Sequence, residues 1–266
     1  MIRIIFVFFA VLLTITPAFA VAGSSQAGDS VLPSADVAAF SNRVQQDLAA
    51  RGAQVAIVAR MGRDPSQLPD GVTYTHVGFW VYSQITLADG TTGQGYRVYN
   101  LYQRADAPTR SDLIQDSPAD FFAGAHRLDA GIIIPDPRLQ RKLLAVIASP
   151  TYAALHNPNY SVLANPATRQ FQNCTEHTLN VLMASIYGTQ DINQIKADIG
   201  AHFTPQTIPV NGLKRSLATI ASAALTTVDH GPVVATATFG TIARFMQASQ
   251  LTAEVYRLTP ERAVRF

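Results

Sequence analysis

Cys174 is the only cysteine of the chain, and it stands where a helix is expected to begin. Apolar residues from Leu179 to Ile186 recur at helical spacing, and Gly188 marks the end of this helix. A helix N-terminus and an imidazolium neighbour both lower the pKa of a thiol and so favour the reactive thiolate. A single cysteine can instead be buried and inert, or bonded to another molecule. The position of Cys174 favours a nucleophile.

His76 is the expected general base. It opens a segment rich in aromatic and β-branched residues, which is typical of a strand. Strand alternation places His76, Gly78 and Trp80 on one face and Val77 on the other. Gly78 leaves room beside the imidazole for another backbone or a substrate. If this strand meets the helix of Cys174, thiol and imidazole form a nucleophile and its base.

A third group should accept the second N–H of the imidazole and so orient the ring. Asn100 and Gln103, both on the strand that returns after the turn at 89–93, are the candidates. A tight turn at Asp89-Gly90 would pair His76 with Gln103, and a longer turn could bring Asn100 alongside. The residue spacing leaves both open.

Gln172 and Asn173 precede the cysteine, and either could donate to the oxyanion of a tetrahedral intermediate. Asn173 is also a favourable N-cap, and we prefer that role for it. His177 shares a helix face with Cys174, but an i,i+3 pair rarely reaches the geometry of a nucleophile and its base. We interpret His177 as a packed or hydrogen-bonded residue, and Arg60 as a surface charge rather than a ligand for an anionic substrate.

The pattern of the chain predicts an α+β fold in a single domain over residues 34–266. A long antiparallel hairpin spans residues 72–103, with a turn at 89–93. The helices expected besides the one at Cys174 cover about 34–51, 137–148, 212–224 and 239–248. Further strands are expected at 53–60, 131–134, 233–237 and 252–258.

The first twenty residues are typical of a secretory signal peptide. Arg3 is followed by an apolar run too short to span a membrane comfortably, and small residues precede cleavage after Ala20 or Ala22. Residues 21–33 are small and polar and predict a flexible lead-in. We therefore expect export to the periplasm, with no transmembrane segment after the signal is removed.

The composition excludes several classes of function. The net charge of +2 does not indicate binding to nucleic acid or to an anionic membrane. The six histidines show no metal-binding spacing, and no glycine-rich phosphate loop is present. We expect no metal, no cofactor, and a substrate that is a small molecule, a peptide or a lipid-linked group.

The motifs at His76-Val77-Gly78-Phe79 and Asn173-Cys174-Thr175, in this order, resemble the circularly permuted papain-like enzymes of the NlpC-type superfamily, which includes lecithin–retinol acyltransferase relatives. The wider chain over roughly 35–260 resembles the bacterial family called domain of unknown function 2145. The resemblance implies an antiparallel sheet packed against the helix that carries Cys174. It also implies Cys174 as nucleophile, His76 as base, and Asn100 in preference to Gln103 as third member, although the separation of His76 from Asn100 is longer than the superfamily's usual hairpin.

Two functions follow as expectations. The first is an exported cysteine hydrolase or acyltransferase that acts on an amide, ester or thioester, with cell-wall peptides or lipid-linked groups as substrates. The alternative is a catalytically inactive periplasmic binding or assembly module on the same scaffold.

Overall fold

The computed structural model describes residues 30–86, 89–210 and 222–266. The signal peptide expected at 1–20, most of the lead-in and most of the helix expected at 212–224 lie outside these residues. They remain predictions from the sequence.

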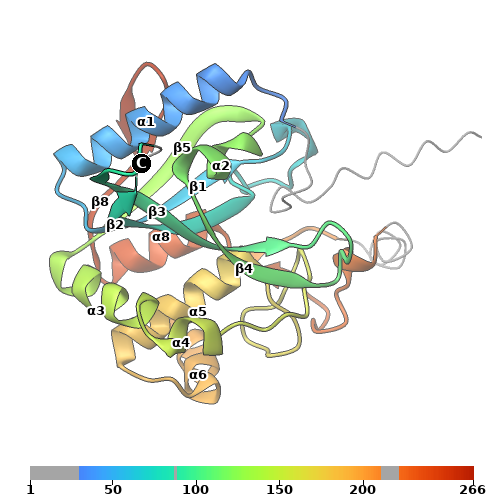
Figure 1. Ribbon diagram of the computed structural model, residues 1–266. Helices are drawn as coiled ribbons and strands as arrows, with labels where there is room; N and C mark the ends of the chain where they lie inside the picture. Colours follow the sequence, from blue (N-terminus) through green and yellow to red (C-terminus); the bar gives the residue numbers. More distant parts are fainter. Residues whose placement is uncertain (1–29, 87–88, 211–221) are drawn as a thin grey trace, which may run out of the picture.

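An antiparallel sheet in the order β4-β3-β2-β1-β5-β8-β9 forms the centre of the fold. Figure 1 shows helices on both of its faces, so the α+β class is confirmed. The strands are β1 (Val55–Met61), β2 (His76–Thr86), β3 (Thr92–Gln103), β4 (Ser111–Asp116), β5 (Arg127–Pro135), β8 (Thr252–Leu258) and β9 (Ala263–Arg265).

Two helices cover one face, α1 (Ser34–Ala50) and α2 (Pro118–Ala123). The stripe of Val37, Phe40, Val44 and Leu48 on α1 packs against Val58, Trp80 and other inward residues of the sheet. Trp80 is fully buried in this cluster, as strand alternation predicts. We call this side of the sheet the α1/α2 face.

The opposite face is covered by α3 (Pro137–Ile147), α5 (Cys174–Tyr187) and α8 (Phe239–Ala248). Helix α5 contacts β2 and β3, which agrees with a sheet packed against the helix that carries the cysteine. Phe79 and Leu182 belong to the core between them. We call this side the α5 face.

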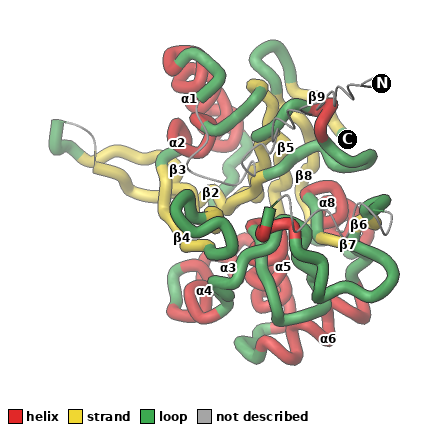
Figure 2. The backbone as a smooth tube through the Cα atoms, turned by 90° about the vertical axis from the view of Figure 1, so that its right-hand side faces the viewer, coloured by secondary structure: helices red, strands yellow, loops and turns green. Residues whose placement is uncertain are grey.

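The remaining elements complete the α5 side of the molecule. They are the helices α4 (Pro150–Ala154) and α6 (Ile192–His202), the small sheet of β6 (Gln206–Thr207) and β7 (Ala235–Thr236), and the 3₁₀ turns η1 (Pro65–Gln67) and η2 (Ala223–Leu225). Figure 2 shows α4 near α3, α6 near α5, and the small sheet of β6 and β7 near α8. The sequence predictions missed β4, α2, α4 and α6, which are all short or weakly patterned.

Local sequence explains the ends of the helices that matter most for the site. Asp136 accepts hydrogen bonds from the N–H groups of Arg138 and Leu139, and Pro137 takes the first helical position of α3. Gly188 ends α5 with a φ of 68°, a conformation that glycine adopts without a steric penalty. Both helix ends were predicted from the sequence.

The register of the β2–β3 hairpin decides which side chains meet. The pairing runs from Thr86↔Thr92 to Gly78↔Asn100, which follows from the longer of the two turns considered above. A methyl group on Gly78 would lie 2.9 Å from Cβ of Asn100, so the glycine is what lets the asparagine occupy this position. The side chain of Asn100 is then diagonal to His76, within reach on the same face.

Gly78→Ala should therefore lower the free energy of unfolding by about 1–3 kcal/mol, because the new methyl group overpacks the hairpin. Urea unfolding measures this change. Gly200→Ala is the matched control, since no atom lies within 4 Å of its new methyl group and alanine favours the α6 helix. A Gly78→Ala protein as stable as the wild type would contradict this account of the register.

Candidate functional site

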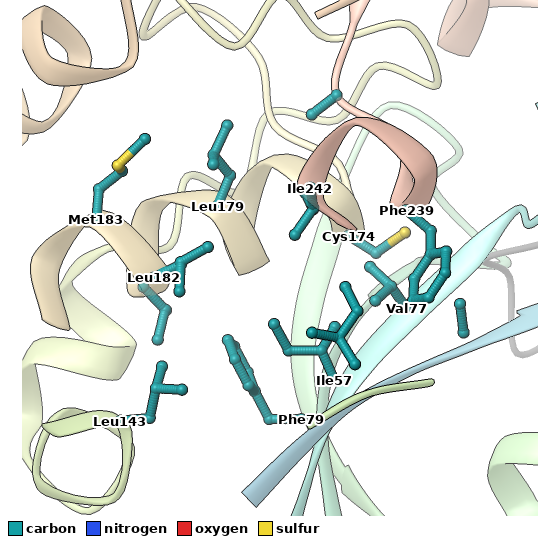
Figure 3. Close-up of a cluster of buried hydrophobic side chains, with 14 of the residues drawn as sticks. Ile57, Val77, Phe79, Leu143, Cys174, Leu179, Leu182, Met183, Phe239 and Ile242 are labelled. Atoms are coloured by element: carbon teal, nitrogen blue, oxygen red, sulfur yellow. The ribbon is translucent and has the colours of Figure 1, made fainter. Parts of the chain in front are cut away.

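Cys174 lies in the first turn of α5 and lines a cleft of about 590 Å³. Cys174 is only 4% exposed to solvent. Figure 3 shows its sulfur at the end of the helix beside Phe239 and Val77. The cleft wall is mostly apolar and includes Leu68, Val72, Tyr74, Tyr160, Val162 and Ile208. The thiol is therefore placed where a bound molecule could reach it.

The sulfur rests against the backbone of β2 on both sides of His76. The thiol donates to the carbonyl oxygen of Thr75 at 3.9 Å, and the backbone N–H of Val77 donates to the sulfur. The helix of the cysteine and the strand of the histidine do meet, as the sequence predicts.

Burial raises the pKa of Cys174 to about 11. Hydrogen bonds from the N–H groups of Val77, Thr175 and Cys174, and the charge of Arg60, act in the opposite direction but are outweighed. The lowered pKa expected from the helix N-terminus is therefore wrong. The cause is desolvation, which disfavours the charged form of any buried acid.

His76 is held by Asn100. Nε2 of the imidazole lies 2.7 Å from Oδ1 of Asn100, whose amide nitrogen donates to the carbonyl oxygen of Ile114 at 3.0 Å. Because Oδ1 only accepts, Nε2 carries the hydrogen and Nδ1 holds the lone pair in the neutral ring. Within the described part of the chain, Nδ1 is buried and has no hydrogen-bond partner.

The surroundings of the imidazole keep it neutral. Its ring stacks on Tyr102 with centroids 4.6 Å apart and also contacts Phe121. Burial first, and the positive charge of Arg60 second, lower the pKa of His76 well below its ordinary value. At neutral pH the residue is a base with an open nitrogen.

The imidazole and the thiol approach β2 from different sides. His76 points to the α1/α2 face with Trp80, whereas Cys174 packs with Val77 and Phe79 on the α5 face. Across the described ranges, no hydrogen bond joins the sulfur to the imidazole. The structure thus brings His76 and Asn100 together and sets Cys174 against the same strand, without direct contact between sulfur and ring.

The alternative third member, Gln103, lies elsewhere. Its side-chain nitrogen donates to the carbonyl oxygen of Pro108 at 2.7 Å. The pairing of His76 with Gln103 required a tight turn at Asp89-Gly90, and the observed register excludes it. A shift of one residue in register exchanges the two faces of a strand, which is why the two candidates were alternatives.

Asn173 and Gln172 are committed to structural hydrogen bonds. Asn173 caps α5, as predicted, by accepting from the N–H of Glu176, and its amide donates to the carbonyl oxygen of Val162. Gln172 accepts from the N–H of Asn157 and donates to the carbonyl oxygen of Leu155. Each amide nitrogen thus donates one hydrogen bond to the backbone, and Gln172 lines the pocket on the other side of α5 whereas Asn173 lines the cleft at Cys174.

Arg60 is buried, not exposed as the sequence analysis assumed. Its guanidinium lies between the rings of Tyr102 and Phe121, with Cζ at 5.9 and 5.5 Å from their centroids. The sequence signal was present, since Arg60 directly follows an unbroken apolar run from Val55 to Ala59. A charged residue that continues such a run is more often inside than one in a mixed segment.

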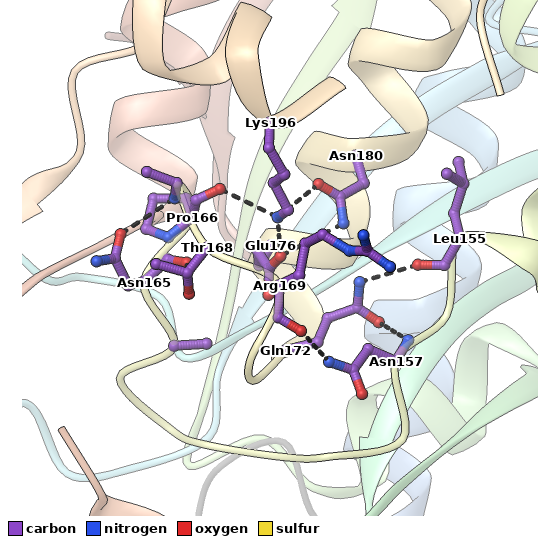
Figure 4. Close-up of polar contacts among 12 residues, drawn as sticks. Leu155, Asn157, Asn165, Pro166, Thr168, Arg169, Gln172, Glu176, Asn180 and Lys196 are labelled. Atoms are coloured by element: carbon purple, nitrogen blue, oxygen red, sulfur yellow. Dashed lines mark hydrogen bonds and ion pairs between the residues drawn. The ribbon is translucent and has the colours of Figure 1, made fainter. Parts of the chain in front are cut away.

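A second polar cluster surrounds the other side of α5 (Figure 4). Glu176 forms a buried ion pair with Lys196, which also donates to Asn180 and to the carbonyl oxygen of Pro166. Burial raises the pKa of Glu176 to about 7. Lys196 and Asn180 were not singled out in the sequence, because nothing in their spacing separates them from surface residues.

His177 is fully enclosed near this cluster. It packs edge-on against Tyr152 at 4.9 Å and lies 6.3 Å from the ring of His156. Burial lowers the pKa of His177 to about 3. This agrees with its interpretation as a packed residue and not a base for Cys174.

Among the described residues, no group of three or more histidine, cysteine, aspartate or glutamate side chains could hold a metal ion. Among the helices of residues 30–86, 89–210 and 222–266, none has the length and apolar character to cross a membrane.

Residues 47–246 match the family described as "Uncharacterized protein conserved in bacteria (DUF2145)". The chain therefore belongs to this family. Comparisons with curated proteins and with solved structures gave no match.

The alkylation rate of Cys174 by iodoacetamide should rise with pH without a plateau below about pH 10, because burial holds the thiol neutral. At pH 8 the rate should be at least about tenfold below that of an exposed cysteine, after allowing for the greater nucleophilicity of a more basic thiolate. Mass spectrometry of the intact protein follows the reaction. A plateau at or below neutral pH would contradict the dominance of desolvation.

Acid should destabilise the protein through His177, because its pKa is about 3 in the folded state and near 6.5 when unfolded. A neutral buried histidine stabilises the fold above the unfolded pKa, and this contribution is lost as the pH falls below it. Between pH 7 and pH 5, His177→Leu should lose about 2 kcal/mol less stability than the wild type. Urea unfolding at both pH values tests this, and the exposed His202→Leu is the control that should follow the wild type.

Proposed function

We propose that this member of the DUF2145 family is a cysteine hydrolase or acyltransferase with a permuted papain-like fold, in which Cys174 is the nucleophile, His76 the base and Asn100 the group that orients the imidazole. One observation carries the proposal. The sulfur contacts the backbone on both sides of a histidine whose Nε2 is bound by an amide and whose Nδ1 is available in the described structure.

The proposed reaction begins from a neutral pair rather than an ion pair. With the pKa of the thiol raised and that of the imidazole lowered, both groups are uncharged at neutral pH. Nδ1 of His76 accepts the proton of the thiol as the sulfur attacks the carbonyl carbon of a bound amide, ester or thioester. This step requires the start of β2 to rearrange, because its backbone lies between the imidazole and the sulfur. Catalytic hydrogen bonds commonly tighten only in the substrate complex.

The remaining steps use the helix end and the same imidazole. The backbone N–H of Cys174 and a neighbouring donor hold the oxyanion, because these groups have no partners within the helix. His76 then returns its proton to the leaving group, and water or a second acceptor resolves the acyl-enzyme. Asn100 keeps Nε2 protonated throughout, so Nδ1 is always the nitrogen that transfers the proton.

Export and substrate class belong to this proposal as well. The sequence of residues 1–20 supports secretion to the periplasm, where cell-wall peptides and lipid-linked groups are present. The apolar cleft beside Cys174 fits the uncharged part of such a molecule.

A binding module is the second candidate, and the position of the imidazole favours it. The backbone of β2 lies between the His76 ring and the thiol, and burial opposes the thiolate. In this alternative the cleft holds an apolar ligand and Cys174 is one of its lining residues.

Reaction with p-nitrophenyl acetate distinguishes the two candidates. The enzyme should release p-nitrophenolate and carry an acetyl group on Cys174, detected by mass spectrometry. Cys174→Ala should abolish the adduct, and His76→Ala should slow its formation by about 10²-fold or more, because the base is lost. Asn100→Ala should slow it by a smaller factor, because the ring is less well oriented.

The exposed His202→Ala is the control for loss of an imidazole and should acylate at the wild-type rate. Equal rates in wild type and His76→Ala would refute the proposed base. Absence of the acetyl adduct in the wild type, with an apolar fluorescent probe bound equally by wild type and Cys174→Ala, would establish the binding module instead.

A further inference from the structure

We infer that Arg60 is a positioning residue of the Cys174 site, because its buried guanidinium is fixed beside His76 and supplies the positive charge that a thiolate at Cys174 requires. This inference rests on the proposed function, since it assigns a role within that reaction. The guanidinium does not contact the substrate cleft, so it acts through the thiol and the imidazole.

The register places Arg60 beside the imidazole. Arg60 and His76 are directly opposite each other on β1 and β2. Residues opposite each other in an antiparallel pair project to the same face of the sheet. The guanidinium and the imidazole therefore share the α1/α2 face, under the point where the sulfur meets the β2 backbone.

The guanidinium occupies a space that only a glycine provides. Gly124 ends α2, and a methyl group on it would lie 2.1 Å from Nη1 of Arg60. The rings of Tyr102 and Phe121 flank the group at distances at which a cation is attracted to an aromatic face. Helix α2 and β3 thus hold the charge in one place.

Several titratable groups lie near the guanidinium. Its charge interacts with His76 on β2, Tyr102 on β3, Asp116 at the end of β4 and Cys174 on α5. Asp120 on α2 acts on Tyr102 from the same side. Burial raises the pKa of Asp116, and arginine stays protonated in proteins.

This one charge acts on both members of the proposed pair. It lowers the pKa of Cys174, which favours the thiolate, and it lowers the pKa of His76, which keeps the imidazole unprotonated before the reaction. An imidazolium formed during the reaction is then a stronger acid and returns its proton more readily to the leaving group. Arg60 is suited to both halves of the proton transfer.

A purely structural Arg60 would behave differently. Replacing a buried charge by an apolar residue of similar length is often tolerated by a fold. If Arg60 only supported the packing of α2, its loss would loosen the core and make Cys174 react faster with iodoacetamide at every pH. The charge proposed here predicts a slower reaction.

The test compares iodoacetamide alkylation of Cys174 between pH 7 and pH 9.5 in the full chain. Arg60→Met should lower the rate about three- to tenfold at each pH, because a rise of one pKa unit reduces the thiolate fraction tenfold below the pKa. Arg60→Lys keeps the charge and should stay closer to the wild type than Arg60→Met does. Arg138→Met removes an exposed charge and should alkylate as the wild type does.

The outcomes separate this inference from the proposed function. An unchanged or faster reaction in Arg60→Met, with circular dichroism and urea unfolding like the wild type, overturns the role of Arg60. If Arg60→Met is unfolded, the alkylation rates of Arg60→Lys and Gly124→Ala test the inference instead. The methyl group that Gly124→Ala adds must displace the guanidinium of Arg60 and should slow the alkylation of Cys174. If His76→Ala alkylates and acylates like the wild type while Arg60→Met is slower, the proposed base is wrong and the role of Arg60 toward the thiolate stands.

Discussion

The pairing of β2 with β3 places Gly78 directly opposite Asn100, and this register determines which side chains surround His76. Strand residues alternate between faces, so a shift of one position would turn Asn100 toward α5 and bring Gln103 beneath the imidazole. The glycine removes the Cβ that would collide with the asparagine. The length of the turn, Gly78 and the amide of Asn100 therefore fix the tautomer of His76.

Desolvation is the second constraint on the site. Both His76 and Cys174 are buried, and burial favours the neutral form of each. A preformed ion pair, as expected for a thiol at a helix N-terminus, is incompatible with this environment. A buried neutral pair can still transfer a proton when charge develops in the reaction, provided that fixed dipoles and charges stabilise the thiolate. In this structure the helix N–H groups, Val77 and Arg60 are the available sources.

The elements with a clear hydrophobic periodicity or clear capping residues were predictable from the sequence. The stripe of α1, the Asp136-Pro137 start of α3, the Gly188 end of α5 and the long hairpin are all local features, and the structure confirms them. The prediction of Asn100 as the neighbour of His76 depended on the number of residues in the turn. Local sequence patterns do not fix that number to better than one residue. The ion pair of Glu176 with Lys196 depends on a tertiary contact between α5 and α6, and no hydrophobic periodicity predicts it. The burial of Arg60 has a signal in the apolar run before it, but its aromatic neighbours come from distant segments.

The anchoring of α5 decides which partner in the proposed site must move. Asn173, Gln172 and Glu176 bind three separate segments around the first turn, so the backbone of Cys174 is held on several sides. The imidazole of His76, in contrast, is held by one hydrogen bond to Asn100 and by ring contacts with Tyr102 and Phe121. The β2 backbone lies between this ring and the sulfur, so rotation of the side chain alone does not bring Nδ1 to Cys174. Any approach of sulfur and Nδ1 on substrate binding therefore requires the start of β2 to move relative to the anchored helix.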